Sequence, residues 1–306
     1  MLDPATEAVA EATHGYALTL EYDGRGFHGW QRQPDRRTVE GVVLDAITAA
    51  TGEVVRLTAA GRTDAGAHAH GQVAALSLRR PWETRRLRFA LNAHLPDDVV
   101  VLDVRSAPHG FHARFDARTR TYRYLLAPRD ERAAVGRDHA WRVSGHLDLE
   151  AMRAAAAQLV GTHDFAAFGR SPKAGGSTVR TIHALSVQSH RVPEAHGGAE
   201  PGGSAGGPLR MMVTIDVTAD AFLYGMMRAI AATLVAVGRG HLDPPSVALL
   251  LDRPRGEGRL ATAPAHGLHQ WAVTYEDLGP GLRIAAEAGG ACGEVAPAPG
   301  EEPRDA

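Results

Sequence analysis

Alternating apolar and polar positions predict the strands of this chain. Over residues 16–22, YALTLEY, every second residue is large and apolar, which is the period of a half-buried strand. Further strand-like runs lie at residues 73–78, 99–104, 121–126, 181–187 and 211–217. Within the run 121–126, Tyr122 and Tyr124 are two positions apart, so they share one face of their strand.

Apolar residues spaced by three and four positions predict helices between these strands. One helix should begin after Thr38, whose side chain can cap the first turn. A second should begin after Asp148 and end at Gly161, a residue type that favours helix ends. The apolar run 221–238 contains Arg228 and a threonine, so we expect a buried helix there and not a membrane span.

The order of these elements predicts an α+β fold made of two similar halves, about 15–108 and 109–276. We expect two disordered ends: an acidic extension, residues 1–14, and a Gly-, Ala-, Pro- and Glu-rich tail, residues 277–306. The Gly/Pro-rich stretch 196–208 should be a flexible hairpin insertion between two strands.

Charge is distributed unevenly along the 306 residues, whose formal net charge is -2. Residues 1–14 and 277–306 hold nine acidic and two basic residues, which leaves 31 basic and 26 acidic residues in between, a net charge of +5. The N-terminus has no Lys or Arg and so lacks the layout of a signal peptide. A single cysteine, Cys292, forms no internal disulfide, which fits a cytoplasmic protein.

The most informative segment is AAGRTDAGAHAHGQV, residues 59–73. It places one carboxylate, Asp64, beside Arg62 and between two glycines, Gly61 and Gly66, directly before a strand-like run. Glycines permit turns and close approach of a ligand to the backbone. Taken alone, this string is more typical of an ordinary surface turn than of a functional site.

Several other blocks accompany this segment in a fixed order. They are YDGRGFHGWQRQP (22–34), LPDDVVV (95–101), FHARFDARTRTYRY (111–124), GTHDFAAFGR (161–170), DAFLYGMMRAI (220–230) and APAHGL (263–268). With these blocks the chain resembles the tRNA pseudouridine synthase A (TruA) family over about residues 16–275. The resemblance implies one catalytic domain over residues 15–276, with a largely antiparallel mixed sheet, flanking helices and a central RNA-binding cleft between the halves. It also implies a homodimer.

The resemblance implies that Asp64 is the catalytic carboxylate for converting uridine to pseudouridine. This reaction breaks the bond from uracil N1 to ribose and rejoins the base through C5, so no cofactor is expected. A carboxylate can act as the nucleophile or as the base that removes a sugar proton, and the sequence leaves both open. The target base must leave its helical stack, and Arg62 matches the family arginine thought to occupy the vacated space.

Two further residues complete the expected site. Tyr122 matches the family tyrosine on which the flipped uracil stacks, whereas Tyr124 is expected in the core. Arg228 needs a counter-charge because a guanidinium buried in an apolar helix is costly. The family places this arginine against Asp64, which it would orient and keep ionised.

Other polar residues suggest RNA contacts and no metal. Candidate phosphate contacts are Arg25, Arg32, Arg36, Arg114, Arg118, Arg120 and Arg123. The pairs His68-x-His70 and His109-x-x-His112 lack an HExxH motif, a cysteine pair or a third ligand at helical spacing, so we expect no metal site. The absence of a second acid near Asp64 argues against a two-carboxylate glycosidase.

The sequence therefore predicts an enzyme that isomerises uridine in the tRNA anticodon stem-loop, at positions 38, 39 and 40 by resemblance. Two alternatives stay open: a non-catalytic RNA-binding or tRNA-folding module, and a pseudouridine synthase acting on another RNA. The chain departs from the family at GAHAH, where Gly-Val-His is usual, and at HQW after Leu268, where an aliphatic pattern is usual. These departures bear on packing and on the fit of the substrate, and they leave Asp64, Tyr122 and Arg228 in place.

Overall fold

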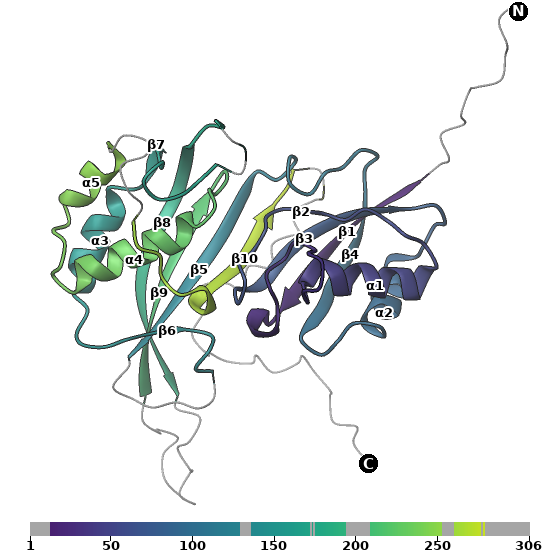
Figure 1. Cartoon of the computed structure of the whole chain (residues 1–306), viewed down its shortest axis with the longest axis horizontal. Helices are drawn as coiled ribbons and strands as arrows, with labels where there is room; N and C mark the ends of the chain where they lie inside the picture. The colour runs from purple at the N-terminus through teal and green to yellow at the C-terminus, as the bar shows by residue number, and fades with distance from the viewer. Residues whose placement is uncertain are drawn as a thin grey trace, which may run out of the picture.

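A computed structural model describes residues 13–128, 136–171, 173, 175–193, 209–252, 260–276 and 278. Ten strands in this part of the chain form one sheet (Figure 1). The main strand order is β4-β1-β3-β10-β5-β9-β8-β7, while β2 pairs with β3 and β6 pairs with β5. All pairs are antiparallel except β10 with β3 and β5 with β6. The predicted largely antiparallel mixed sheet of an α+β fold is confirmed.

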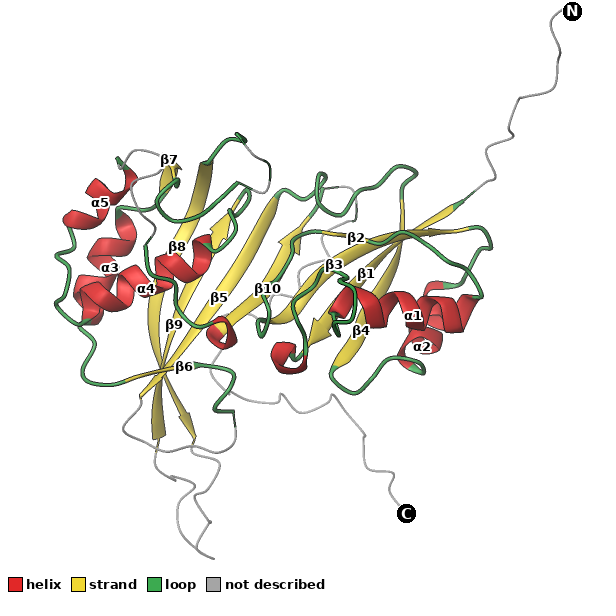
Figure 2. Cartoon of the chain, viewed as in Figure 1, coloured by secondary structure: helices red, strands yellow, loops and turns green. Residues whose placement is uncertain are grey.

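Each half of the sheet carries its own helices. The first half comprises β1 (His14–Tyr22), η1 (Gly24–Gly26), α1 (Val39–Thr51), β2 (Thr58–Ala59), β3 (His68–Leu78), α2 (Thr84–Asn92) and β4 (Val99–Ala107). The second comprises β5 (Thr119–Pro128), β6 (Trp141–Val143), α3 (Leu149–Ala157), β7 (Gly161–Asp164), β8 (Val179–Pro193), β9 (Leu209–Ala219), α4 (Met226–Gly238), α5 (Ser246–Leu251), η2 (Ala265–Gly267) and β10 (Leu268–Thr274). Figure 2 shows α1 and α2 gathered at the β1–β4 end, and α3, α4 and α5 at the β7–β9 end.

The two halves are joined through β10, a strand that the hydrophobic pattern did not predict. It runs parallel to β3 on one side and antiparallel to β5 on the other. In its sequence, LHQWAVT, the polar residues His269 and Gln270 are buried. The alternation of apolar and polar residues that marks a strand is therefore not visible. Separate hydrophobic clusters lie on either side of this junction, one under α3 and α4 and one under α1 and α2.

Local signals account for the helix boundaries. The Thr38 side chain accepts a hydrogen bond from Gly41 N–H at the start of α1, and the Asp148 side chain accepts one from Ala151 N–H at the start of α3, as predicted. The predicted end of α3 at Gly161 is wrong, because the helix stops at Ala157 and Gly161 begins β7. The α2 helix was not predicted, since only two of its nine residues are buried.

The ends of the domain differ slightly from those predicted. β1 begins at His14, inside the predicted N-terminal extension. Leu278 is buried beside Tyr275, and its carbonyl accepts a hydrogen bond from Arg105, so packed structure reaches into the predicted tail. The predicted insertion 196–208 lies outside the described residues. In the described part of the chain, no helix is long and apolar enough to cross a membrane.

Candidate active site

The loop that carries Asp64 connects β2 to β3 and is held by buried hydrogen bonds. Gln72 Nε2 donates to the carbonyl oxygen of Gly61 over 2.7 Å, and the hydroxyl groups of Tyr22 and Thr63 are hydrogen-bonded at 2.8 Å. The Gln72 and Tyr22 side chains come from the strands β3 and β1 beneath the loop. The sheet therefore fixes the backbone on both sides of Arg62 and next to Asp64.

Arg228 lies against Asp64, as the buried-charge argument predicts. Its Nη1 atom is 2.7 Å from Asp64 Oδ2, and its Nε donates to the carbonyl oxygen of Ala263 over 2.7 Å. The two side chains are only 22% and 12% exposed. Arg228 stands in the first turn of α4, which begins at Met226 after Gly225 in a left-handed conformation. The guanidinium thus links α4 to the loop that carries Asp64 and to the segment before η2.

Tyr122 is buried on β5 at the wall of the same site. Its ring packs edge-on against Phe222, with centroids 4.7 Å apart. A Cβ atom added to Gly61 would lie 3.0 Å from the Tyr122 hydroxyl, so the loop and the tyrosine approach each other where only glycine fits easily. Burial raises the pKa of Tyr122 to about 12, so the phenol keeps its proton at neutral pH.

A cavity of about 600 Å³ brings these residues together from both halves of the sheet. Asp64, Tyr122, Arg228 and Arg62 all line it. So do Arg114, Arg120, Arg170 and Arg180, and among the described residues the carboxylates that line it are Asp64 and Glu40. The site is therefore strongly positive inside a chain whose formal net charge is negative.

Four of the seven arginines expected to contact phosphate are held by carboxylates or by backbone carbonyl oxygens. Arg120 is buried, its guanidinium donates to backbone carbonyl oxygens including those of Ala60 and Asp220, and burial lowers its pKa. It therefore fastens the start of the Asp64 loop to the end of β9. Arg123 pairs with Asp216 at 2.7 Å.

Arg118 pairs with Glu276, and Arg25 pairs with Asp23 and, at 4.0 Å, with Asp138. Of the expected phosphate contacts, Arg114 is the one that is both exposed and part of the cavity, while Arg32 and Arg36 are exposed elsewhere. Sequence reasoning missed Arg170 and Arg180 as cavity residues. Arg170 closes the block GTHDFAAFGR, which was the available signal, whereas Arg180 has no local motif.

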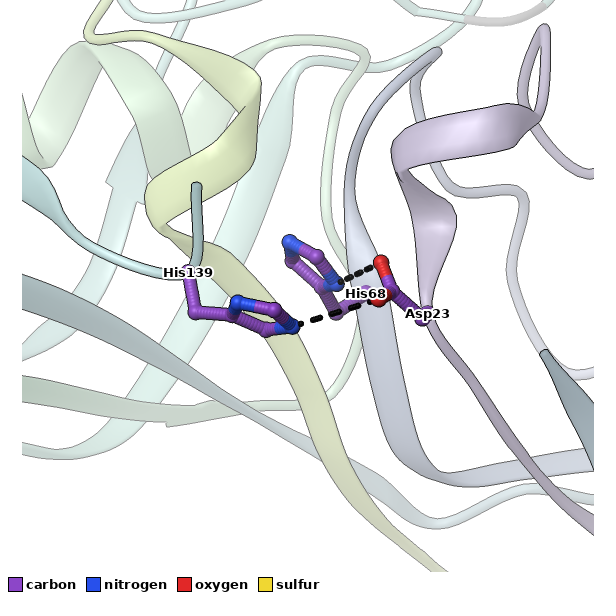
Figure 3. Close-up of side chains that lie close together, drawn as sticks. All are labelled: Asp23, His68 and His139. Atoms are coloured by element: carbon purple, nitrogen blue, oxygen red, sulfur yellow. Dashed lines mark ion pairs between the residues drawn. The ribbon is translucent and has the colours of Figure 1, made fainter. Parts of the chain in front are cut away.

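A group of possible metal ligands lies where β1, β3 and the segment before β6 meet (Figure 3). Asp23 Oδ1 is 3.3 Å from His68 Nδ1, and Asp23 Oδ2 is 3.4 Å from His139 Nε2. Both carboxylate oxygens already accept hydrogen bonds from Arg25, and His68 Nδ1 accepts one from Gly24 N–H at 3.2 Å. A metal ion would have to displace this guanidinium and this amide, so the residues present fit a metal poorly. The expectation of no metal stays a prediction.

Burial and hydrogen bonds shift the pKa values of Asp23, His68 and the neighbouring His269. Burial alone would raise the pKa of Asp23, but the hydrogen bonds from Arg25 lower it to about 2. Burial lowers the pKa of His68 to about 4 and that of His269 to about 3, so both rings are neutral at pH 7. The two rings stack at 4.7 Å across β3 and β10 and help to join the halves.

Comparison with known proteins gives a consistent result. The family model described as tRNA pseudouridine synthase matches residues 19–116 and 155–276. A protein of Methylorubrum populi named tRNA pseudouridine synthase A is 40% identical over 263 residues, covering 86% of this chain and 98% of its own length. Proteins with the same name from Citrifermentans bemidjiense and Thermoanaerobacter sp. are 39% and 35% identical, covering 85% and 84% of this chain and 97% and 98% of their own lengths.

Proposed function

The chain belongs to the tRNA pseudouridine synthase family, and from that premise we propose that it isomerises uridine to pseudouridine at positions 38, 39 and 40 of the tRNA anticodon stem-loop. It is an isomerase acting on uridine in tRNA. The target positions are part of the proposal and rest on the resemblance of the motifs quoted above. The roles of individual residues are likewise proposed.

The observation that carries the proposal is the ion pair between Arg228 and Asp64 at the wall of a positive cavity. An ionised carboxylate beside the ribose can bond to C1′ as a nucleophile or remove a sugar proton, and either route breaks the bond between C1′ and N1 and releases uracil. Arg228 holds the carboxylate in place through a charge-assisted bond. The released uracil turns until C5 faces C1′. Bonding of C5 to C1′ then breaks the bond between the carboxylate and C1′ or, on the second route, is accompanied by return of a proton to the sugar, and C5 loses its own proton.

The cavity wall suits a uracil that has left its stack. In our proposal the ring of Tyr122 provides the surface on which the flipped base rests, next to the carboxylate. Extrusion of a base costs a few kcal/mol, which the positive cavity offsets by attracting the phosphates on either side. Arg62, exposed at the loop, would fill the position that the base has left.

A non-catalytic RNA-binding module is the alternative of another class. Such a module would have no need for a carboxylate held by a largely buried arginine at the base of its binding cavity, since a negative charge there weakens RNA binding. The Asp64–Arg228 pair therefore favours an enzyme. A synthase that acts on a different RNA would differ from the proposed enzyme only in its substrate, so the choice of RNA in the assay distinguishes the two.

The test uses tRNA transcripts that carry tritium at C5 of uridine, because isomerisation releases this hydrogen to water. We expect release from transcripts with uridine at 38, 39 or 40, and none from a transcript in which all three positions are cytidine. Mapping of pseudouridine in the product then assigns the sites. Equal release from the all-cytidine transcript would exclude these positions, and no release from any tRNA would exclude the activity.

From the family resemblance we also propose that the protein is a homodimer and that it is located in the cytoplasm. Sedimentation velocity of the purified full chain tests the first. A species of one 32.5 kDa chain at micromolar concentration would contradict it.

A further inference from the structure

Two large aromatic side chains are exposed at the rim of the active-site cavity. Phe115, between β4 and β5, is 73% exposed, and Tyr224, between β9 and α4, is 58% exposed. Both line the cavity that contains Asp64. Exposed aromatic rings at a charged cavity are typical of binding surfaces, because large apolar groups elsewhere are usually covered.

Each ring is accompanied by an arginine. The guanidinium carbon of Arg114 lies 5.7 Å from the Phe115 ring centroid, and that of Arg170 lies 5.1 Å from the Tyr224 centroid. Within the described residues, neither arginine forms an ion pair with a carboxylate. A planar cation beside an aromatic face offers two stacking surfaces, and its free N–H groups can donate to a phosphate.

The second of these arrangements is fixed by the backbone. Arg170 N–H donates to the carbonyl oxygen of Tyr224 at 3.2 Å, and Tyr224 N–H donates to that of Arg170 at 2.9 Å. This isolated bridge ties the segment after β7 to the segment before α4. These two hydrogen bonds fix the backbone of Tyr224, whose side chain is exposed to solvent.

The position of the rings separates them from the place of the target base. Tyr122 is buried next to the loop of Asp64, whereas Phe115 and Tyr224 face solvent at the edge of the same cavity. A nucleotide that has entered the cavity leaves its neighbours outside, partly unstacked and in need of new contacts. Base–aromatic stacking satisfies that need with little dependence on sequence.

We propose that Phe115 with Arg114, and Tyr224 with Arg170, form two base-stacking platforms that hold the nucleotides next to the target uridine. Each ring takes the face of an unstacked base, and each arginine takes a neighbouring phosphate. This inference rests on the proposed action of the site on tRNA. It does not depend on which tRNA positions are modified.

The experiment compares Phe115→Ala and Tyr224→Ala with a matched control, Phe89→Ala. Phe89 is 55% exposed and also has arginines near its ring, Arg85 and Arg88, but it lies on α2 away from the cavity. We expect each platform variant to lower kcat/KM for tRNA by about 5- to 150-fold, the range of one base–aromatic stack. Phe89→Ala should stay within about twofold of wild type.

Conservative variants and a binding measurement make the test specific. Phe115→Trp and Tyr224→Phe should restore most of the activity, because the flat face persists. The Kd for tRNA, measured with Asp64→Asn in each background so that no turnover occurs, should rise together with the loss in kcat/KM. Thermal unfolding of all variants should match wild type, because exposed side chains contribute little to the core.

The effect of each variant is measured at whichever uridine the wild-type enzyme converts. If positions 38, 39 and 40 are unmodified, the proposed targets fail while the stacking measurement still stands. If Phe115→Ala and Tyr224→Ala bind and convert tRNA like Phe89→Ala, the platforms are overturned whatever the target. A loss that the conservative variants fail to restore would equally overturn stacking.

Discussion

At the scale of single residues, the proposed chemistry depends on the carboxylate of Asp64. Asp64→Asn keeps the size of the side chain and removes the nucleophilic or basic oxygen. We expect tritium release to fall to background while the Kd for tRNA changes by less than about tenfold. Asp45→Asn, an exposed site on α1, is the control and should retain full turnover. Comparable turnover by Asp64→Asn would remove this residue from the mechanism.

The second residue-scale prediction concerns the coupling of Arg228 to Asp64. Arg228→Met suits an apolar helix but leaves the carboxylate and the Ala263 carbonyl without a donor. Loss of one member of a buried pair costs about 3–5 kcal/mol, and partial exposure here reduces this to about 2–3 kcal/mol. Arg228→Lys should fall between wild type and Met in activity, since it keeps the charge and loses the planar geometry.

A double-mutant cycle with Asp64→Asn measures this coupling directly. The double variant should lose less unfolding free energy than the two single variants together, because each single change leaves the other partner unpaired. Urea denaturation of the four proteins provides the values. Strict additivity would contradict a direct interaction between these two side chains.

Tyr122 provides the third prediction. Tyr122→Phe should bind tRNA nearly normally, because the ring face remains, whereas Tyr122→Ala should lose binding and turnover. Burial raises the pKa of Tyr122 from 10.0 to about 12, so the phenol stays protonated below that value. The ratio of wild-type to Phe-variant rates should therefore be constant from about pH 7 to about pH 9. A ratio that titrates inside this interval would show an ionised phenolate in the reaction.

Sequence reasoning reached some of these residues and not others for a physical reason. Arg228 was identifiable because a charge within an apolar run requires a partner, and Asp64 because its turn is part of a recognised motif. Arg120 was assigned to phosphate wrongly, since its carbonyl partners come from separate segments that only the fold brings together. Arg180 gave no local signal at all for the same reason.

At the scale of elements, the loop that carries Asp64 depends on hydrogen bonds from the strands below it. Gln72 on β3 is fully buried, donates to the carbonyl oxygen of Gly61 and accepts from Gln270 on β10 at 3.0 Å. Gln72→Leu leaves both groups without this partner, so we expect a loss of about 1–3 kcal/mol in unfolding free energy. We also expect a fall in the single-turnover rate that exceeds any change in tRNA affinity.

The matched control for this prediction is Gln188→Leu on β8, where the glutamine is exposed. It should change the unfolding free energy by less than about 0.5 kcal/mol and leave the rate unchanged. If Gln72→Leu lowers stability and leaves the single-turnover rate at the wild-type value, β3 supports the fold without positioning the loop.

The pattern of predicted and missed elements has a common cause. In β4 buried positions alternate over residues 99–101, and in β1 the large apolar residues Tyr16, Leu18, Leu20 and Tyr22 all join the cluster under α1 and α2, so the period of two is visible in the sequence although both faces of β1 are buried. β10 is central and flanked on both edges, and it buries His269 and Gln270 against polar partners from β3. Elements that join the two halves therefore escape a rule based on apolar periodicity.

At the scale of the whole molecule, the charge around the cavity is opposite in sign to the net charge of the chain. The chain is formally negative, while arginines outnumber acids three to one around the cavity. RNA affinity follows the phosphates neutralised locally and the counterions released there. A protein of this composition is therefore expected to bind tRNA in a strongly salt-dependent manner.

Three variants of the protein test whether the arginines around the cavity, and not the net charge of the chain, determine how tRNA binding depends on salt. Plots of log K against log salt for tRNA should be steep and negative, and Arg114→Ala should reduce the slope by about one, the value for one phosphate contact. The control Arg86→Ala, exposed on α2 outside the cavity, should leave the slope unchanged. Removing residues 1–12 and 279–306, which hold eight acidic and two basic residues, should leave binding at low salt unchanged or stronger. A large loss of affinity on trimming would mean that an end of the chain contacts the RNA, and an unchanged slope in Arg114→Ala would remove that arginine from the interface.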